Sequence, residues 1–188
     1  MDAKAVDERE RGAPVAGGSF LITDTVPGEV FSPEDLSEEQ RLVGQTARDF
    51  VEQEVFPVLD RIEGKDWALT RDLLKKLGQL ELLGIEVPGA YGGAELDKVT
   101  ALLVTEALSA GSFGVTCSAH VGIGMEPIVY FGTPAQRERY LPKMVRGELI
   151  GAYALTEPTA GSDAMSIRTK AVRSLDGAAW LLTGTKQF

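Results

Sequence analysis

Apolar positions recur with the spacing of an α-helix through most of the first 147 residues. After Ser37-Glu-Glu-Gln40, which has the form of a capping box, one apolar face continues to about Pro57 and predicts a first amphipathic helix. A second helix is expected to begin near Thr70, because leucines repeat there at the same spacing. Gly84 is expected to end it.

Three further helices are predicted after a glycine-rich loop at residues 90–94, and they cover residues 97–112, 115–130 and 133–147. The segment 115–130 is apolar nearly all round, so we expect it to be buried. The last helix opens with a second capping box, Thr133-Pro-Ala-Gln136, which places a proline at the first helical position.

The apolar period changes from Ile150 onward. Residues 171–173 and 180–183 have strand-like composition and flank the turn sequence Ser174-Leu-Asp-Gly177, which predicts a β-hairpin. The fold class is therefore α+β. We expect a flexible segment at residues 1–30, an all-α domain at 31–149 and the incomplete start of a β-domain at 150–188.

Composition narrows the function classes. The net charge of −9 argues against binding to nucleic acid or to an anionic membrane surface, because both need clustered Lys and Arg. Cys117 and His120 are the only residues of their kinds, which argues against a disulfide framework, a His-based metal site and a serine triad. No apolar run approaches a transmembrane length and the first residues lack the apolar core of a signal peptide, so a cytoplasmic location is expected.

The run from Tyr153 to Ser166 carries the most distinctive chemistry. A proline turn is followed by Ala160-Gly-Ser-Asp163, where a glycine lets backbone N–H groups approach a ligand and the Ser162 hydroxyl can donate beside them. This arrangement suits a phosphate group or the edge of a flavin. The alternative is an ordinary surface turn capped by Asp163, because these residue types are common in turns.

The sequence Leu155-Thr-Glu-Pro-x-Ala-Gly-Ser-Asp163 resembles the signature of the acyl-CoA dehydrogenases, flavoenzymes that desaturate acyl-CoA thioesters. Three further stretches, in the family's order, are similar to its motifs. They are Val87-Pro-x-x-Tyr91-Gly-Gly93, Phe131-Gly-Thr-Pro-x-Gln-x-x-x-Tyr140-Leu-Pro-Lys143, and the pair Ile167-Arg-Thr-Lys-Ala171 and Leu182-Thr-Gly-x-Lys186. The resemblance extends from about Glu38 to Phe188.

The resemblance implies a helical N-terminal domain followed by the first strands of a barrel-like middle domain. It also implies FAD, an acyl-CoA substrate, an electron-transfer flavoprotein as electron acceptor and a homo-oligomer. The family's catalytic base is a glutamate in a third domain that is absent here, so the resemblance places no catalytic residue in this chain. We therefore expect an N-terminal fragment of a longer enzyme that is inactive by itself.

The resemblance also assigns site residues by position. Tyr153, Leu155, Thr156 and Phe188 would contact the flavin ring, whereas Gly161 and Ser162 would lie at the pyrophosphate, with Ser162 also near the thioester. Pocket positions for the acyl chain fall on Thr116, Ala119, Gly122 and Ile123. For these four, close helix packing through small residues is an equally compatible interpretation, and core or strand positions are the alternative for Thr156 and Phe188.

Other residues are given structural roles. His120 is expected to be a core residue bonded to a carbonyl, and Gly122-Ile-Gly124 is rejected as a dinucleotide motif because its third glycine is missing. Glu157, Asp163 and Arg168 are not assigned acid–base work, because a carboxylate beside a turn is more often a cap or part of an ion pair.

Two other functions stay open at this level. An acyl-CoA oxidase shares the fold, and a non-catalytic acyl-CoA-binding or helical interaction module is a different class. Because Ala119 and Gly122 are small, and because residues 118–120 and 166–169 resemble the very-long-chain branch of the family, a medium-to-long acyl chain is expected.

Overall fold

The computed structural model describes residues 31–188. The chain divides into two compact units, residues 1–37 and 38–188. The described part of the first unit holds one short 3-10 turn, Pro33–Asp35. The flexible segment expected at residues 1–30 lies outside the described residues.

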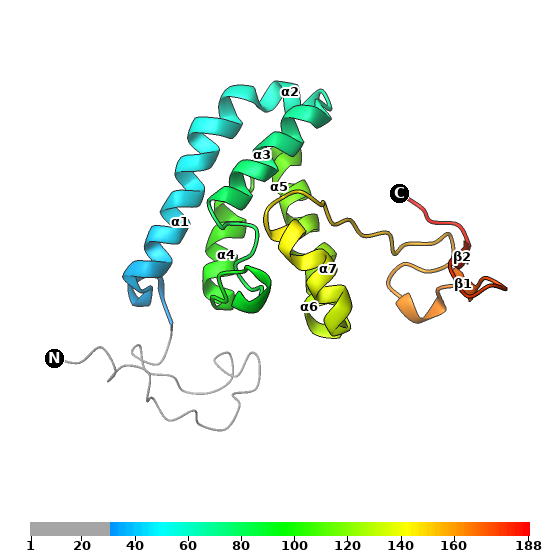
Figure 1. Ribbon diagram of the computed structural model, residues 1–188. Coiled ribbons are helices and arrows are strands. Elements are labelled where there is room, and N and C mark those ends of the chain that lie inside the picture. Colours follow the sequence, from blue (N-terminus) through cyan, green and yellow to red (C-terminus); the bar gives the residue numbers. More distant parts are fainter. Residues whose placement is uncertain (1–30) are drawn as a thin grey trace, which may run out of the picture. The chain divides into compact units, whose positions relative to one another are not determined.

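The second unit begins with a set of helices (Figure 1). Its α-helices have these bounds: α1 Glu38–Phe50, α2 Leu59–Glu63, α3 Trp67–Gln79, α4 Lys98–Ala107, α5 Gly111–Ser118, α6 Glu126–Phe131 and α7 Pro134–Val145. Two π-helical segments, Val51–Val55 and Ala119–Met125, follow α1 and α5 directly. Short 3-10 turns lie at Phe56–Val58, Gly89–Tyr91 and Ala164–Ser166.

The first predicted helix is confirmed at its start but not at its end. Instead of stopping near Pro57, the chain widens into the π turn Val51–Val55, tightens into the 3-10 turn Phe56–Val58 and continues as α2. Proline has no N–H to give to the preceding turn, so the α-helical pattern cannot pass through it unchanged. A bend therefore replaces the expected terminus.

The second predicted helix is displaced. It begins at Trp67 instead of Thr70, because the Asp66 carboxylate accepts the N–H of Leu69 at 3.1 Å and caps the helix. It ends at Gln79, well before Gly84. The chain turns directly after the helix, at Glu81, which has a φ of 61°. Gly84 serves packing instead, since a Cβ atom there would lie 2.8 Å from the Val145 side chain.

The helix predicted over residues 115–130 is wrong in two respects. The helical run starts earlier, at Gly111, and contains the π-helical segment Ala119–Met125 between α5 and α6. The segment is also partly open, since Val115 is 72% exposed and Tyr130 is 54% exposed. Nothing in the described chain covers the exposed parts of these side chains, and a hydrophobic pattern cannot say where a partner lies.

The capping box before α7 is confirmed. The Thr133 hydroxyl accepts the N–H of Gln136 at 3.3 Å, and the Gln136 side chain accepts the N–H of Thr133 at 2.9 Å. Two buried clusters lie among the helices. The larger joins α1, α3, α4 and α5, with the Phe50 and Phe113 ring centroids 6.4 Å apart, and the smaller includes Leu141, Met144 and Val145 of α7.

After α7 the chain is extended, with an isolated bridge between Glu157 and Ala160. Strands β1 (Lys170–Arg173) and β2 (Trp180–Thr183) then pair antiparallel, with Val172 opposite Leu181. Every residue of both strands is exposed. The predicted α+β class and hairpin are confirmed, whereas the domain boundary at 149/150 stays a prediction.

Candidate functional site

The signature loop, residues 153–166, is organised around the buried carboxylate of Glu157. This carboxylate accepts the N–H groups of Arg168 at 2.7 Å and of Thr169 at 3.0 Å, and it pairs with Lys186 at 2.9 Å. The Thr169 hydroxyl lies beside it without reaching the geometry of a hydrogen bond. The Thr169 hydroxyl, these N–H groups and Lys186 lower the pKa of Glu157 to about 2.

While Glu157 points inward, donors on the other side of the loop stay open. The hydroxyls of Thr156 and Ser162 and the backbone N–H groups of Gly161 and Ser162 have no hydrogen-bond partner within residues 31–188. All three residues are exposed. Unpaired hydroxyl and amide donors gathered in one loop suit the oxygen atoms of a phosphate or the polar edge of a flavin.

The structure brings some predicted flavin residues together. The N–H of Gln187 donates to the carbonyl of Thr156 at 2.8 Å, so the chain beside Phe188 runs along the signature loop. The Phe188 ring is fully exposed and Tyr153 is 48% exposed, so both offer open aromatic faces. Leu155 is half-buried, and its carbonyl accepts a hydrogen bond from Lys186 at 2.9 Å.

Three of the four predicted acyl-chain residues share a groove of about 490 Å³ along α5 and the π-helical segment, which we call the outer groove. Ala119, Gly122 and Ile123 line it, but Thr116 does not, and the Thr116 hydroxyl donates to the carbonyl of Ser112 at 3.0 Å. The groove also contains residues that sequence reasoning missed: Ser109, Gly111, Gly114, Val115 and Ser118. Their helical spacing from Gly122 is a signal that could have found them.

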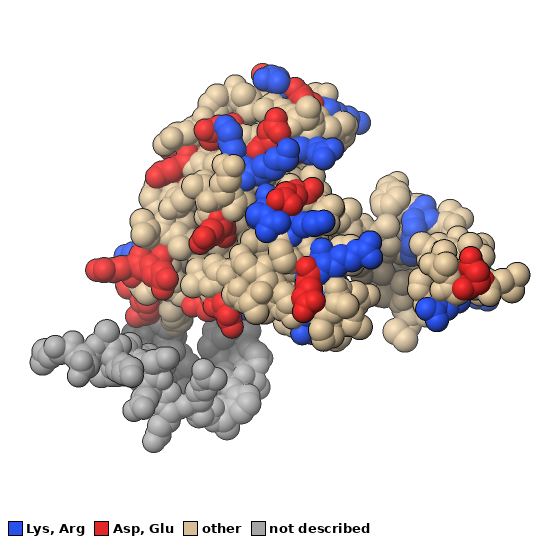
Figure 2. All heavy atoms as spheres, viewed as in Figure 1, with Lys and Arg blue, Asp and Glu red and all other residues tan. Residues whose placement is uncertain are grey.

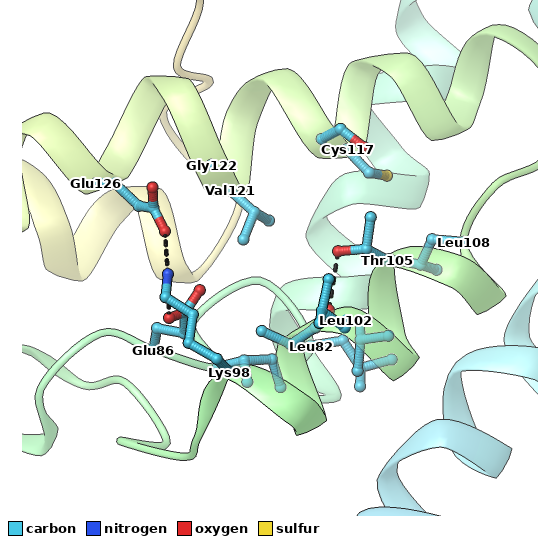
Figure 3. A pocket seen from close by; sticks show the side chains of 14 residues that line it. Leu82, Glu86, Lys98, Leu102, Thr105, Leu108, Cys117, Val121, Gly122 and Glu126 are labelled. Carbon is cyan, nitrogen blue, oxygen red and sulfur yellow. Dashed lines mark hydrogen bonds and ion pairs between the residues drawn. The ribbon is translucent and has the colours of Figure 1, made fainter. Parts of the chain in front are cut away.

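A second space, the inner cavity, lies between α4 and the helical run that starts at Gly111 and has a volume of about 270 Å³ (Figure 3). It shares Ser118 and Gly122 with the outer groove. Lys98 lies at its rim and pairs with Glu86 at 2.5 Å and with Glu126 at 2.7 Å. Hydrogen bonds to Glu126 and Glu86 raise the pKa of Lys98 above its ordinary value. No pattern in the sequence predicts this cavity.

His120 is a buried core residue bonded to a carbonyl, as predicted. Its Nε2 atom lies 3.0 Å from the carbonyl oxygen of Met144, and its Nδ1 atom accepts the N–H of Gly151 at 2.9 Å. Burial lowers the pKa of His120, and the bond to Met144 opposes this only in part. Gly122 and Gly124 lie within the π-helical segment, where they cannot form a dinucleotide-binding loop.

Glu157, Asp163 and Arg168, which were not assigned acid–base work, make local contacts in and beside the signature loop. Glu157 belongs to an ion pair, and Asp163 accepts a hydrogen bond from the Ser166 hydroxyl at the start of a 3-10 turn. The exposed Arg168 contributes its backbone N–H to Glu157. Among the described residues, no three His, Cys, Asp or Glu side chains gather as metal ligands would.

The face shown in Figure 2 carries Lys, Arg, Asp and Glu side chains interspersed with one another over the helices. The expectation, drawn from the net charge, that the protein does not bind nucleic acid stays a prediction. In the described chain no helix combines the length and hydrophobicity that crossing a bilayer requires.

Comparison with known proteins decides the family. The family model described as "Acyl-CoA dehydrogenase, N-terminal domain" matches residues 37–148. The chain belongs to the acyl-CoA dehydrogenase family. This family match covers the whole helical part, including the residues that line the outer groove.

Curated acyl-CoA dehydrogenases match beyond the helical part. A probable acyl-CoA dehydrogenase of Bacillus subtilis is 47% identical over 189 residues, which cover 100% of this chain and 31% of that protein. The mitochondrial isovaleryl-CoA dehydrogenase of Pongo abelii is 39% identical over 154 residues, which cover 80% of this chain and 36% of that protein. The chain thus spans about a third of the length of these relatives.

A solved acyl-CoA dehydrogenase has the same arrangement. The crystal structure of acyl-CoA dehydrogenase complexed with FAD from Bacillus anthracis superposes with a TM-score of 0.87 at 46% identity, covering 93% of this chain and 30% of that one. The superposed part therefore includes the helices and most of the segment that follows them. The chain has the fold of the N-terminal part of an acyl-CoA dehydrogenase.

Proposed function

We propose that this chain forms the first third of an FAD-dependent enzyme that introduces an α,β double bond into acyl-CoA thioesters. The observation that carries the proposal is a hollow of about 220 Å³ lined by both Ile123 and Tyr153. Ile123 also lines the outer groove, so a residue expected at the acyl chain adjoins a residue expected at the flavin. The sharing of one hollow by Ile123 and Tyr153 supports a common site for the acyl chain and the flavin.

The residues of the loop fit a flavin. Bound FAD would supply the redox chemistry by accepting a hydride from the β-carbon of the acyl chain. The Thr156 hydroxyl would donate to the polar edge of the ring, and the N–H groups of Gly161 and Ser162 would donate to the pyrophosphate. Tyr153 and Phe188 would offer aromatic faces to the ring.

The outer groove would hold the acyl chain. Its lining is largely apolar, and each methylene that it buries would contribute about 0.8 kcal/mol. A Cβ atom on Gly122 would meet nothing within 4 Å, so this position leaves room for a chain of medium to long length. The base that removes the α-proton is expected from the part of the enzyme beyond residue 188.

The proposal extends to the electron acceptor, the oligomeric state and the location. Electrons would pass to an electron-transfer flavoprotein, the full-length enzyme would be a homo-oligomer in the cytoplasm, and residues 1–188 alone would not turn over. A dye-reduction assay of the 188-residue chain tests the last point, and turnover above background would contradict it. The alternative, an acyl-CoA oxidase, passes its electrons to oxygen. Oxygen consumption with acyl-CoA, compared with reduction of the flavoprotein acceptor, distinguishes the two enzymes.

The experiment for the acyl groove compares kcat/KM for butyryl-, octanoyl- and palmitoyl-CoA in the full-length enzyme and in Gly122→Glu. The open space around Gly122 lets the fold accept the side chain, so the variant should lose the longer substrates selectively. Thr116→Val, which lies outside the groove, is the control. An unchanged profile in Gly122→Glu, or butyryl-CoA as the best wild-type substrate, would exclude this assignment.

A further inference from the structure

The π-helical segment Ala119–Met125 has two different faces. Ala119, Gly122 and Ile123 line the outer groove, whereas His120 and Met125 are buried on the protein side. π-Helical turns are rare, and they occur frequently at functional sites. The buried face of this one contacts Gly151, where the extended chain that leads to Tyr153 and Thr156 begins.

His120 makes the first contact and its tautomer is fixed. The Gly151 N–H can only donate, so the Nδ1 atom that it approaches at 2.9 Å must be the unprotonated nitrogen. Nε2 therefore carries the hydrogen and donates to the carbonyl of Met144 at 3.0 Å. His120 is fully buried, so both ring nitrogens are used within the protein.

Two glycines make the second contact. A Cβ atom added to Gly124 would lie 2.9 Å from the Cα atom of Gly151, and a Cβ atom added to Gly151 would lie 2.9 Å from the Cα atom of Gly124. The two backbones therefore touch without any side chain between them. This contact fixes the separation of the helix from the extended segment, and the His120 bond fixes the position of Gly151 along the helix.

The extended segment that begins at Gly151 has few other constraints. In the described chain, the next backbone hydrogen bond after the Gly151 N–H is the one that the Thr156 carbonyl accepts from Gln187. Between these two points the Leu155 carbonyl accepts only the Lys186 ammonium. The Gly151 anchor therefore sets one end of the segment that carries Tyr153.

We propose that His120 is a positioning residue that ties the helix lining the acyl groove to the extended segment that carries Tyr153 and Thr156, so that the acyl chain and the flavin ring are held in register. The inference rests on the proposed function. His120 touches neither ligand, and it acts through Gly151. A change that breaks the Nδ1 bond should disturb the flavin while leaving the acyl groove in place.

Two substitutions separate the two bonds of the ring. The amide oxygen of His120→Asn can take the place of Nδ1 and accept the Gly151 N–H, whereas the amide of His120→Gln reaches the position of Nε2 and can only restore the bond to Met144. Met125→Leu is the control, because Met125 is a buried residue of the same π-helical segment, has no hydrogen bond to the extended chain at Gly151, and is replaced by a side chain of similar volume.

The test uses the full-length enzyme and measures FAD affinity, the flavin midpoint potential, kcat and KM. His120→Gln should weaken FAD binding about tenfold, the effect of one lost hydrogen bond, and should shift the potential and lower kcat at an unchanged KM for palmitoyl-CoA. His120→Asn and Met125→Leu should stay near wild type. Equal behaviour of the Asn and Gln variants, with FAD bound normally, would overturn the inference.

If either variant does not fold, amide hydrogen exchange in the wild-type protein tests the bond between Gly151 and His120 independently. The Gly151 N–H should exchange more slowly than the Ala152 N–H, and equal rates would overturn the tether to His120. A wild-type full-length protein that holds no FAD would instead contradict the proposed function. The two failures are therefore distinguishable.

Discussion

The Nζ atom of Lys186 lies 2.9 Å from the Oε1 atom of Glu157, and this pair joins residues far apart in the sequence at the base of the signature loop. The Glu157 side chain is only 4% exposed, so the charge is held inside the loop. Because the same carboxylate binds the N–H groups of Arg168 and Thr169, one side chain gathers three stretches of chain. The loop is braced from within while its free donors face outward.

Glu157→Gln should remove this brace and part of the acid sensitivity of the protein. The folded pKa of about 2 lies below the ordinary value of 4.5, so the carboxylate stabilises the fold above pH 4.5 and loses this contribution as the pH falls toward 2. The variant should be less stable at pH 6 and should lose less on acidification. Chemical denaturation of both proteins at pH 6 and pH 3 measures this.

Glu138→Gln is the matched control for that experiment, because Glu138 is exposed on α7 and has no ion pair within residues 31–188. It should follow the wild-type pH profile. Identical acid sensitivity in Glu157→Gln and wild type would show that the Glu157 carboxylate is not the group that titrates with unfolding.

His120 should make the fold lose stability in mild acid. Its folded pKa is lowered by burial, whereas the unfolded value is about 6.5. As the pH falls below about 6.5, the unfolded chain takes up a proton that the folded ring cannot, and stability decreases by at most about 1.4 kcal/mol per pH unit until the folded pKa is reached. His120→Asn should lack this slope in denaturation between pH 7.5 and 5.5. A parallel slope in the two proteins would refute the assignment.

Thr156→Ala in the full-length enzyme should slow flavin reduction more than it weakens substrate binding. The hydroxyl would act on negative charge that develops only as the flavin is reduced, and one such donor is worth about 3 kcal/mol at most. Stopped-flow reduction by palmitoyl-CoA measures the rate. Thr159→Ala, an exposed threonine of the same loop, is the control, and a wild-type rate in Thr156→Ala would contradict the role of the hydroxyl.

Local signals in the sequence succeeded where the responsible chemistry is local. The capping box at Thr133 and Gln136 predicted the start of α7, because both partners lie within one turn. The Ser174–Gly177 turn predicted the hairpin for the same reason, and Gly177 adopts a φ of 69° there. Contacts between residues a few positions apart could therefore be predicted from the sequence.

Contacts between residues far apart in the sequence could not be predicted. Nothing in the sequence says that His120 and Gly151 meet, since they are 31 positions apart, and the same holds for Glu157 and Lys186. The resemblance to the family, and not the helical spacing, assigned Thr116, Ala119, Gly122 and Ile123 to the acyl pocket, and the outer groove contains the last three of them. The segment with the exposed Val115 and Ile123 was expected to be buried, because a hydrophobic pattern does not show whether a partner is present.

The most direct test of the proposed function is an anaerobic titration of the purified full-length enzyme with palmitoyl-CoA, followed by the visible absorbance of the flavin. The account predicts that the protein purifies yellow and that its flavin band bleaches as the enoyl-CoA product forms. A colourless protein, or a flavin band that butyryl-, octanoyl- and palmitoyl-CoA all leave unbleached, would contradict it.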